Sequence, residues 1–115
     1  EFEVKVANST EDALDVLDQY TPAAIIIDWK TPKMGGRKFC LKLRSQMRFD
    51  FIPILVLSAY DNNVNKPTSF LAGADEFLSK PVSVGEIREK VKLLVENQEF
   101  SKNLQERLSK RKNSN

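Results

Sequence analysis

The sequence has no histidine and a single cysteine, Cys40. Catalysis or metal binding through imidazole is therefore excluded, and one thiol can form neither an internal disulfide nor a zinc cluster. Long apolar runs are also missing, because none approaches the roughly 20 residues of a membrane span. The chain opens without a signal-peptide pattern. We therefore expect a cytoplasmic domain without a membrane segment, in a reducing compartment that suits a lone thiol.

The chain also lacks a strong charge of either sign. Its 115 residues carry 18 basic and 16 acidic side chains, a length that fits one domain. The basic excess lies after Glu96, and the body of the domain is neutral. The basic residues of the central segment are predicted to lie on the solvent face of one helix: Arg37, Lys38, Lys42, Arg44 and Arg48. We therefore expect no nucleic-acid surface on this domain.

Three short apolar segments lie between stretches with helical spacing: residues 23–27, 52–57 and 74–78. Runs this short and this apolar are typical of buried strands in a parallel sheet. Alternation of apolar and charged residues at positions 2–6 predicts a further strand at a sheet edge. The resulting order βαβαβαβα predicts an α/β fold, a parallel sheet with helices on both faces.

The helix boundaries follow from caps and breakers. Ser9 or Thr10 is predicted to cap the first helix, and the second is predicted to run to about Met47 with that side chain inward. Proline in a helix interior costs about 3 kcal/mol, so a loop or frayed turn is predicted up to Lys66 and a short helix over residues 67–72. Ser83 with Glu86 forms a capping box for the last helix, whose inward face is predicted to be Val84, Ile87, Val91, Leu94 and Val95.

Three polar residues lie at or just after the ends of the predicted strands: Asp28, Ser58 and Lys80. The carboxyl ends of parallel strands share one edge of the sheet, where ligands of such folds bind. A carboxylate, a hydroxyl and an ammonium are therefore expected to converge. This trio suits the handling of a phosphoryl group on an acid.

The segments around these residues resemble the receiver domain of two-component response regulators, with its CheY-like, flavodoxin-like fold. The matching stretches are the apolar strand ending in Asp28, the loop over residues 28–36, Leu57-Ser58-Ala59, and residues 72–81. The intervals of 30 residues from Asp28 to Ser58 and 22 from Ser58 to Lys80 also fit the family. The resemblance runs from Phe2 to about Glu96.

The resemblance implies that Asp28 accepts a phosphoryl group from a histidine kinase or a phosphotransfer protein. Lys80 would neutralise charge on the phosphoryl oxygens, and Ser58 would donate a hydroxyl hydrogen bond. Mg²⁺ would bridge Asp28, the phosphoryl group and the backbone carbonyl of Lys30. Phe77 matches the family's switch aromatic, although a plain core phenylalanine would look the same. The resemblance also implies a cis peptide bond before Pro81.

The family's first strand, acidic pair and first helix have no counterpart in the sequence. Residues 1–97 are therefore expected to form a partial receiver domain in which Mg²⁺ binds poorly. Three explanations are open: the chain is part of a longer protein, another chain supplies the missing elements in a swapped homodimer, or the sheet has rearranged. Residues 98–115 are expected to form a helical extension or a linker to an output domain.

Three functions compete on this sequence. The first is a phosphorylated signalling receiver, and the second is a phosphorylation-independent interaction or dimerisation module of the same fold. The third is a phosphatase with an aspartyl nucleophile. Such enzymes usually need a second acid two residues after the nucleophile, and Lys30 occupies that position. We therefore expect a signalling domain, not an enzyme.

Overall fold

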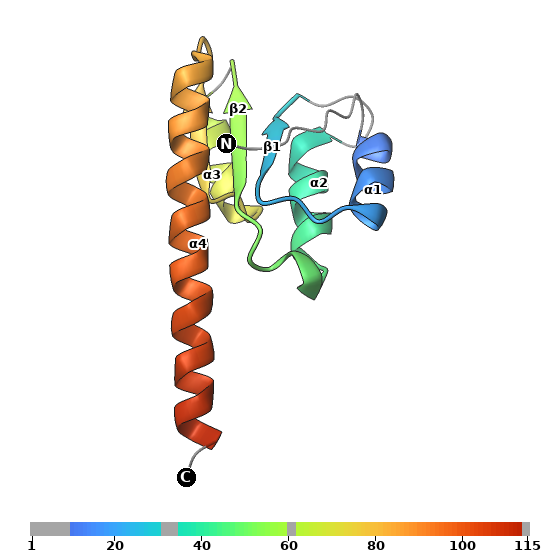
Figure 1. The fold of residues 1–115 in the computed structure, drawn as a ribbon. Helices are drawn as coiled ribbons and strands as arrows, with labels where there is room; N and C mark the ends of the chain where they lie inside the picture. The colour runs from blue at the N-terminus through green and yellow to red at the C-terminus, as the bar shows by residue number, and fades with distance from the viewer. Residues whose placement is uncertain (1–9, 31–34, 60–61, 114–115) are drawn as a thin grey trace.

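The structure, a computed structural model, describes residues 10–30, 35–59 and 62–113. Its three strands, β1 (Ile25–Asp28), β2 (Ile54–Ser58) and β3 (Glu76–Ser79), form one parallel sheet in the order β1-β2-β3 (Figure 1). The register aligns Ile27 with Val56 and Val56 with Phe77. The predicted α/β fold with a parallel sheet is therefore confirmed. The strand predicted at residues 2–6 lies outside the described residues.

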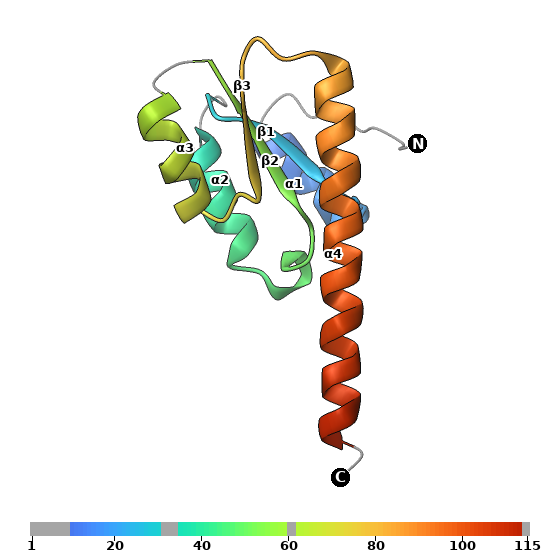
Figure 2. The same cartoon turned by 90° about the vertical axis from the view of Figure 1, so that its left-hand side faces the viewer.

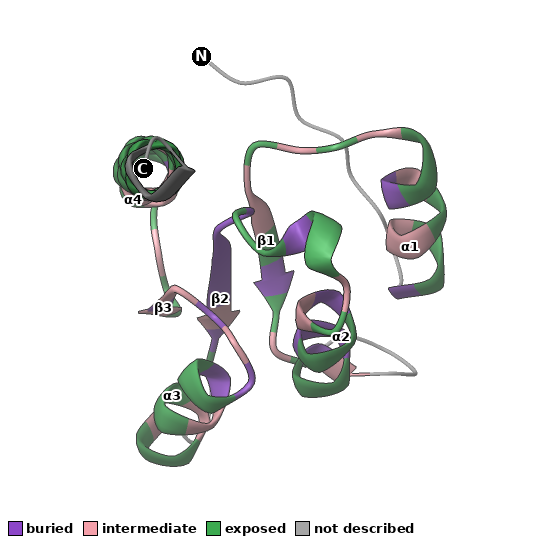
Figure 3. Cartoon of the chain, turned by 90° about the horizontal axis from the view of Figure 1, so that it is seen from below, coloured by how far each residue is buried: buried purple, intermediate pink, exposed green. Residues whose placement is uncertain are grey.

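Four α-helices accompany the sheet: α1 (Thr10–Gln19), α2 (Gly35–Arg44), α3 (Asn62–Leu71) and α4 (Val84–Asn113). Seen from below, α4 lies on one face of the sheet and α2 and α3 lie on the other, while α1 stands beyond β1 (Figure 3). Helices on both faces were predicted. None of the helices in the described part of the chain is long and apolar enough to cross a membrane.

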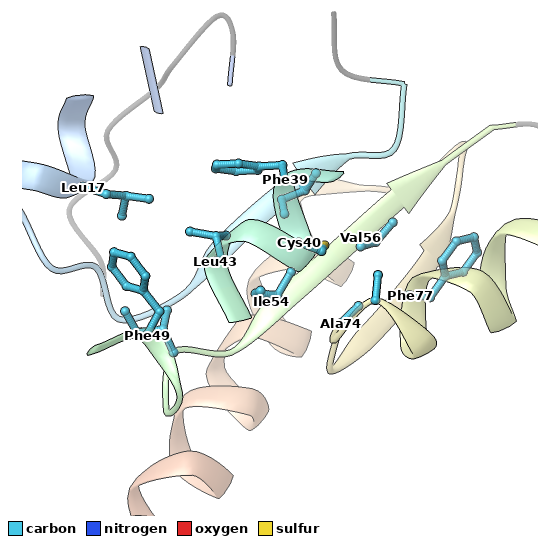
Figure 4. Close-up of a cluster of buried hydrophobic side chains, with 12 residues drawn as sticks. Leu17, Phe39, Cys40, Leu43, Phe49, Ile54, Val56, Ala74 and Phe77 are labelled. Atoms are coloured by element: carbon cyan, nitrogen blue, oxygen red, sulfur yellow. The ribbon is translucent and has the colours of Figure 1, made fainter. Parts of the chain in front are cut away.

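The core lies between the sheet and the helices on the α2 side. Phe39 and Leu43 of α2 gather with Ile54 and Val56 of β2, and Leu17 of α1 extends the cluster (Figure 4). β2 is the central strand, and its residues Ile54, Leu55 and Val56 are fully buried. Burial on both faces explains why the sequence of this strand is a continuous apolar run. The carboxyl end of β2 is thereby fixed in place.

Helix α4 begins at the predicted capping box. The Glu86 backbone N–H donates to Ser83 Oγ at 3.0 Å, and the Ser83 backbone N–H donates to Glu86 Oε1 at 3.4 Å. Val91 is buried against the sheet, but Val84 is largely exposed, which corrects its predicted inward position. The second half of the helix runs past the sheet as a single exposed rod (Figure 2).

Three further predictions are wrong. Helix α3 starts at Asn62 and contains Pro67, where a loop had been predicted up to residue 66. Met47 belongs to a short 3-10 helix, η1 (Met47–Phe49), and is exposed because α2 ends at Arg44. Arg44 itself does not lie on the solvent face, because its guanidinium turns back into the fold. For α3 and for Arg44, contacts between distant parts of the chain override the local pattern.

Candidate functional site

The carboxyl edge of the sheet brings together two of the three predicted site residues in direct contact. Asp28 ends β1, and Lys80 follows the last residue of β3. The Lys80 Nζ lies 2.5 Å from Asp28 Oδ2, although the two residues are 52 positions apart. Ser58 ends the central strand β2, and its carbonyl accepts the Lys80 backbone N–H at 2.8 Å. The peptide bond between Lys80 and Pro81 is cis.

The other Asp28 oxygen is held by the backbone. The Lys30 N–H donates to Asp28 Oδ1 at 3.1 Å, so each carboxylate oxygen accepts a hydrogen bond. The hydrogen bond from Lys80 lowers the pKa of the Asp28 carboxyl below its ordinary value, with smaller help from the Lys30 N–H and against a partial desolvation. The carboxylate is therefore ionised near neutral pH, as a nucleophile must be.

The ion pair remains open to solvent. The Asp28 side chain is 50% exposed and the Lys80 side chain 37% exposed. Ala59, directly after Ser58, is exposed and small, so it leaves room beside the site. A half-exposed carboxylate of this kind can be reached by a group carried on another molecule.

The loop after Asp28 packs closely on the start of α2. The Gly36 backbone N–H donates to the Trp29 carbonyl at 3.1 Å. A Cβ at Gly36 would lie 2.9 Å from Trp29 Cα, closer than real Cβ contacts. The absence of a side chain at Gly36 thus lets the residues that follow Asp28 lie against the helix.

Ser58 is nearly inaccessible, with 3% of its surface exposed. The Asn65 Nδ2 donates to Ser58 Oγ at 3.2 Å. Asn62 Nδ2 donates to Ser79 Oγ at 3.0 Å and reaches the Ser58 carbonyl at 3.5 Å. The sequence interpretation missed both asparagines, because it placed them in a loop. Their spacing of three was the available signal, since residues i and i+3 share one face of a helix.

Comparison with known proteins gives this arrangement a family. A family model described as "Response regulator receiver domain" matches residues 1–92. The chain belongs to the response regulator receiver domain family.

Individual receiver-containing proteins agree with this assignment. The chain is 33% identical over 101 residues to the response regulator Rre1 of Synechocystis sp., covering 88% of this chain and 44% of that protein. The chain thus spans less than half the length of that relative.

Solved structures support the same fold. A putative response regulator from Chloroflexus aurantiacus superposes with a TM-score of 0.73 at 32% identity, covering 77% of this chain and 73% of that one. The receiver domain of a Pseudomonas aeruginosa sensor histidine kinase superposes with a TM-score of 0.72 at 20% identity, covering 81% of this chain and 76% of that one. The second likeness shows the fold alone.

The receiver residues described here do not fit a divalent metal site by themselves. The described part of the chain contains no group of three or more acidic or thiol side chains that could hold a metal ion. Asp28 is already paired with the Lys80 ammonium and the Lys30 N–H, and a cation beside the carboxylate opposes a second cation. The predicted Mg²⁺ contacts at Asp28 and at the Lys30 carbonyl therefore remain predictions.

Phe77 of β3 is buried in the core cluster. Burial fits both its predicted role as the receiver's switch aromatic and its role as a plain core residue, so the two alternatives stay open. Among the described residues, β1 is one edge of the sheet, and no further strand lies beside it there. The three explanations for the missing elements therefore stay predictions.

Proposed function

We propose that this receiver domain accepts a phosphoryl group on Asp28 within a two-component phosphorelay. The observation that carries the proposal is the contact at the carboxyl edge of the sheet. A half-exposed carboxylate is reachable by a donor, and a lysine ammonium lies 2.5 Å from one of its oxygens. Phosphoryl transfer depends mainly on positioning and on neutralising negative charge. Asp28 and Lys80 supply the nucleophile and the positive charge.

In the proposed step an oxygen of Asp28 attacks the phosphorus of a phosphohistidine. The new oxygen–phosphorus bond forms as the phosphorus–nitrogen bond breaks. The electron pair returns to the imidazole, which takes up a proton or already carries one on its other nitrogen. The product is an acyl phosphate on Asp28. The Lys80 ammonium then pairs with the phosphoryl oxygens, and the Ser58 hydroxyl donates to one of them.

The proposed donor is a histidine kinase or a phosphotransfer protein. The similar Pseudomonas domain is itself part of a sensor histidine kinase. We propose that the domain signals and does not turn over a substrate. The acyl phosphate is the end product of the proposed steps, and its formation changes the conformation of the domain. A cytoplasmic location is proposed because Cys40 is a free, buried thiol, which suits a reducing compartment.

Magnesium is proposed only as an aid to the family's chemistry. The Pseudomonas receiver domain carries a magnesium ion in its active-site cleft. For the present chain, Asp28 would need a further acidic ligand, because Mg²⁺ requires near-octahedral oxygen coordination. A Mg²⁺ titration of this domain should therefore show weak binding.

A second candidate function is interaction without phosphorylation. Helix α4 runs past the sheet and exposes Phe100, Leu104 and Leu108 at spacings of four residues. Such a stripe lies on one side of a helix and suits contact with another helix. If the domain is a phosphorylated receiver, the same helix would pass the signal to an output domain or to a second copy of this chain.

Incubation with acetyl phosphate and Mg²⁺ followed by intact-mass measurement separates these functions. The first candidate requires a gain of one phosphoryl group in the wild type and no gain in Asp28→Asn. Asp18→Asn is the matched control, because Asp18 is an exposed acid paired with Arg48 away from the site. The absence of any gain in the wild type would contradict the first candidate and favour the second.

A further inference from the structure

The amino-terminal part of α3 contacts the ends of two strands through asparagine side chains. Asn65 donates to the hydroxyl oxygen of Ser58, and Asn62 donates to the hydroxyl oxygen of Ser79. Both asparagines lie on the helix face turned toward the sheet, three residues apart. The carboxyl edge of the sheet is therefore connected to α3 by side-chain hydrogen bonds.

Helix α3 packs against β2, β3 and α2 but contains several features that weaken a helix. Ser69 is its buried residue, and Pro67 removes a backbone donor from its interior. The hydroxyls of Thr68 and Ser69 donate to the Val64 and Lys66 carbonyls, bonds that slightly destabilise a helix. The asparagine hydrogen bonds therefore add polar contacts to the packing of α3 against β2, β3 and α2.

The direction of the bond to Ser58 has a chemical consequence. A hydroxyl has one hydrogen to donate and two lone pairs that accept. Since Asn65 donates its N–H to the Ser58 oxygen, the Ser58 hydroxyl donates its own hydrogen in another direction. Ser58 lies at the end of the central strand, between Asp28 on β1 and Lys80 after β3. A phosphoryl group on Asp28 would offer acceptor oxygens in that region.

We propose that Asn65 is a positioning residue for phosphorylation, which fixes the Ser58 hydroxyl as a hydrogen-bond donor to the phosphoryl group. This role rests on the proposed function of Asp28. Asn62 would fasten the same helix face without touching the Ser58 hydroxyl.

The decisive variant is Asn65→Asp, which keeps the size of the side chain and reverses the hydrogen bond. A carboxylate can only accept, so it would draw the Ser58 hydrogen away from the phosphoryl group. Asn63→Asp is the matched control, because Asn63 is exposed on the same helix and gains the same charge. Asn65→Ala removes the hydrogen bond without adding charge.

The measurement is the initial rate of phosphorylation by acetyl phosphate with Mg²⁺, in variants whose urea unfolding shows that they fold. We expect Asn65→Ala to be about fivefold slower and Asn65→Asp about tenfold or more, as expected for the loss of one oriented hydrogen bond. Asn63→Asp should stay within about twofold of the wild type. In a Ser58→Ala background, the Asn65 changes should have no further effect, which a purely structural role would not produce.

The outcomes separate the two proposals. A wild type that gains no phosphoryl group overturns the function of Asp28 and with it the role of Asn65. A phosphorylated wild type whose rate is unchanged by Asn65→Asp overturns the role of Asn65 alone. Equal slowing by Asn65→Asp with and without the Ser58 hydroxyl would do the same, because the effect would then come from charge or from the helix.

Discussion

Two charged pairs lie at opposite edges of the same sheet, and they are built differently. At the carboxyl edge, Lys80 and Asp28 form an exposed pair. At the amino edge, Arg44 and Asp75 form a pair at 2.7 Å with side chains only 20% and 27% exposed. The first pair is accessible to another molecule, whereas surrounding residues largely cover the second pair.

The amino-edge pair makes hydrogen bonds to several other parts of the chain. Arg44 donates to the carbonyls of Gly73, Phe49 and Ile52 at 2.8–2.9 Å. Asp75 Oδ2 also accepts the Ile54 backbone N–H at 2.7 Å. One guanidinium thus joins the end of α2, the loop before β2 and the start of β3. The difference fits a structural role for the amino-edge pair and, for the exposed pair, the change of partner that the proposed phosphorylation requires.

The largest expected effect is the loss of the amino-edge pair. Arg44→Ala should lower the free energy of unfolding by about 2–4 kcal/mol, because it leaves Asp75 and three carbonyls without their partner in a partly buried place. Urea unfolding measures the loss. Asp18→Ala is the matched control: the Arg48–Asp18 pair is exposed, and its loss should cost less than about 1 kcal/mol. Equal losses in the two variants would remove the contrast between closed and exposed pairs.

The next effect concerns Gly73, which supplies one of the carbonyls. Its φ of +111° disfavours other residues, and a Cβ there would lie 2.5 Å from Arg44 Cγ. Gly73→Ala should therefore destabilise the domain by about 1–3 kcal/mol in the same measurement. Gly85→Ala provides the comparison, because its Cβ would meet Ser83 Oγ at an ordinary 3.7 Å. That variant should be neutral or slightly stabilising, and a similar loss at both glycines would contradict the prediction.

The two edges also differ in how far the sequence predicts them. Asp28, Ser58 and Lys80 were predictable because the carboxyl ends of parallel strands share one edge, so that position along the chain fixes position in space. Arg44 was misplaced because its role depends on a long side chain reaching three separate segments. Helical periodicity alone placed it with its basic neighbours on the solvent face.

The asparagines of α3 were missed for a related reason. Pro67 and the asparagines are poor helix formers, and local propensity therefore favoured a loop. Hydrogen bonds from Asn62 and Asn65 to the strand ends supply what propensity lacks. Local preference fails where a few long-range contacts decide the structure, and here such a place adjoins the candidate site.

A smaller effect on stability is expected at the carboxyl edge. Lys80→Ala should change the free energy of unfolding by less than about 1 kcal/mol, because the pair is exposed. The same change should slow phosphorylation of Asp28 about tenfold or more, because the transferred charge loses its cation. Lys66→Ala, at an exposed lysine of α3, is the control for net charge. A large loss of stability with an unchanged rate would make this pair structural, like the one at the other edge.

The smallest effect is the acid dependence of the carboxyl-edge pair. The Lys80 hydrogen bond holds the pKa of Asp28 below its ordinary value of 3.8, so ionised Asp28 favours the folded state. This contribution is complete above the unfolded pKa and disappears as the pH falls through the lower, folded pKa. Wild type and Lys80→Ala should therefore differ by a few tenths of a kcal/mol at about pH 6 and converge once the pH falls below the folded pKa of Asp28. Urea unfolding across that pH range measures the difference in the free energy of unfolding. In an Asp28→Asn background, the effect of Lys80→Ala should not depend on pH. A difference that grows on acidification would mean that Lys80 stabilises the fold through contacts other than the Asp28 carboxylate.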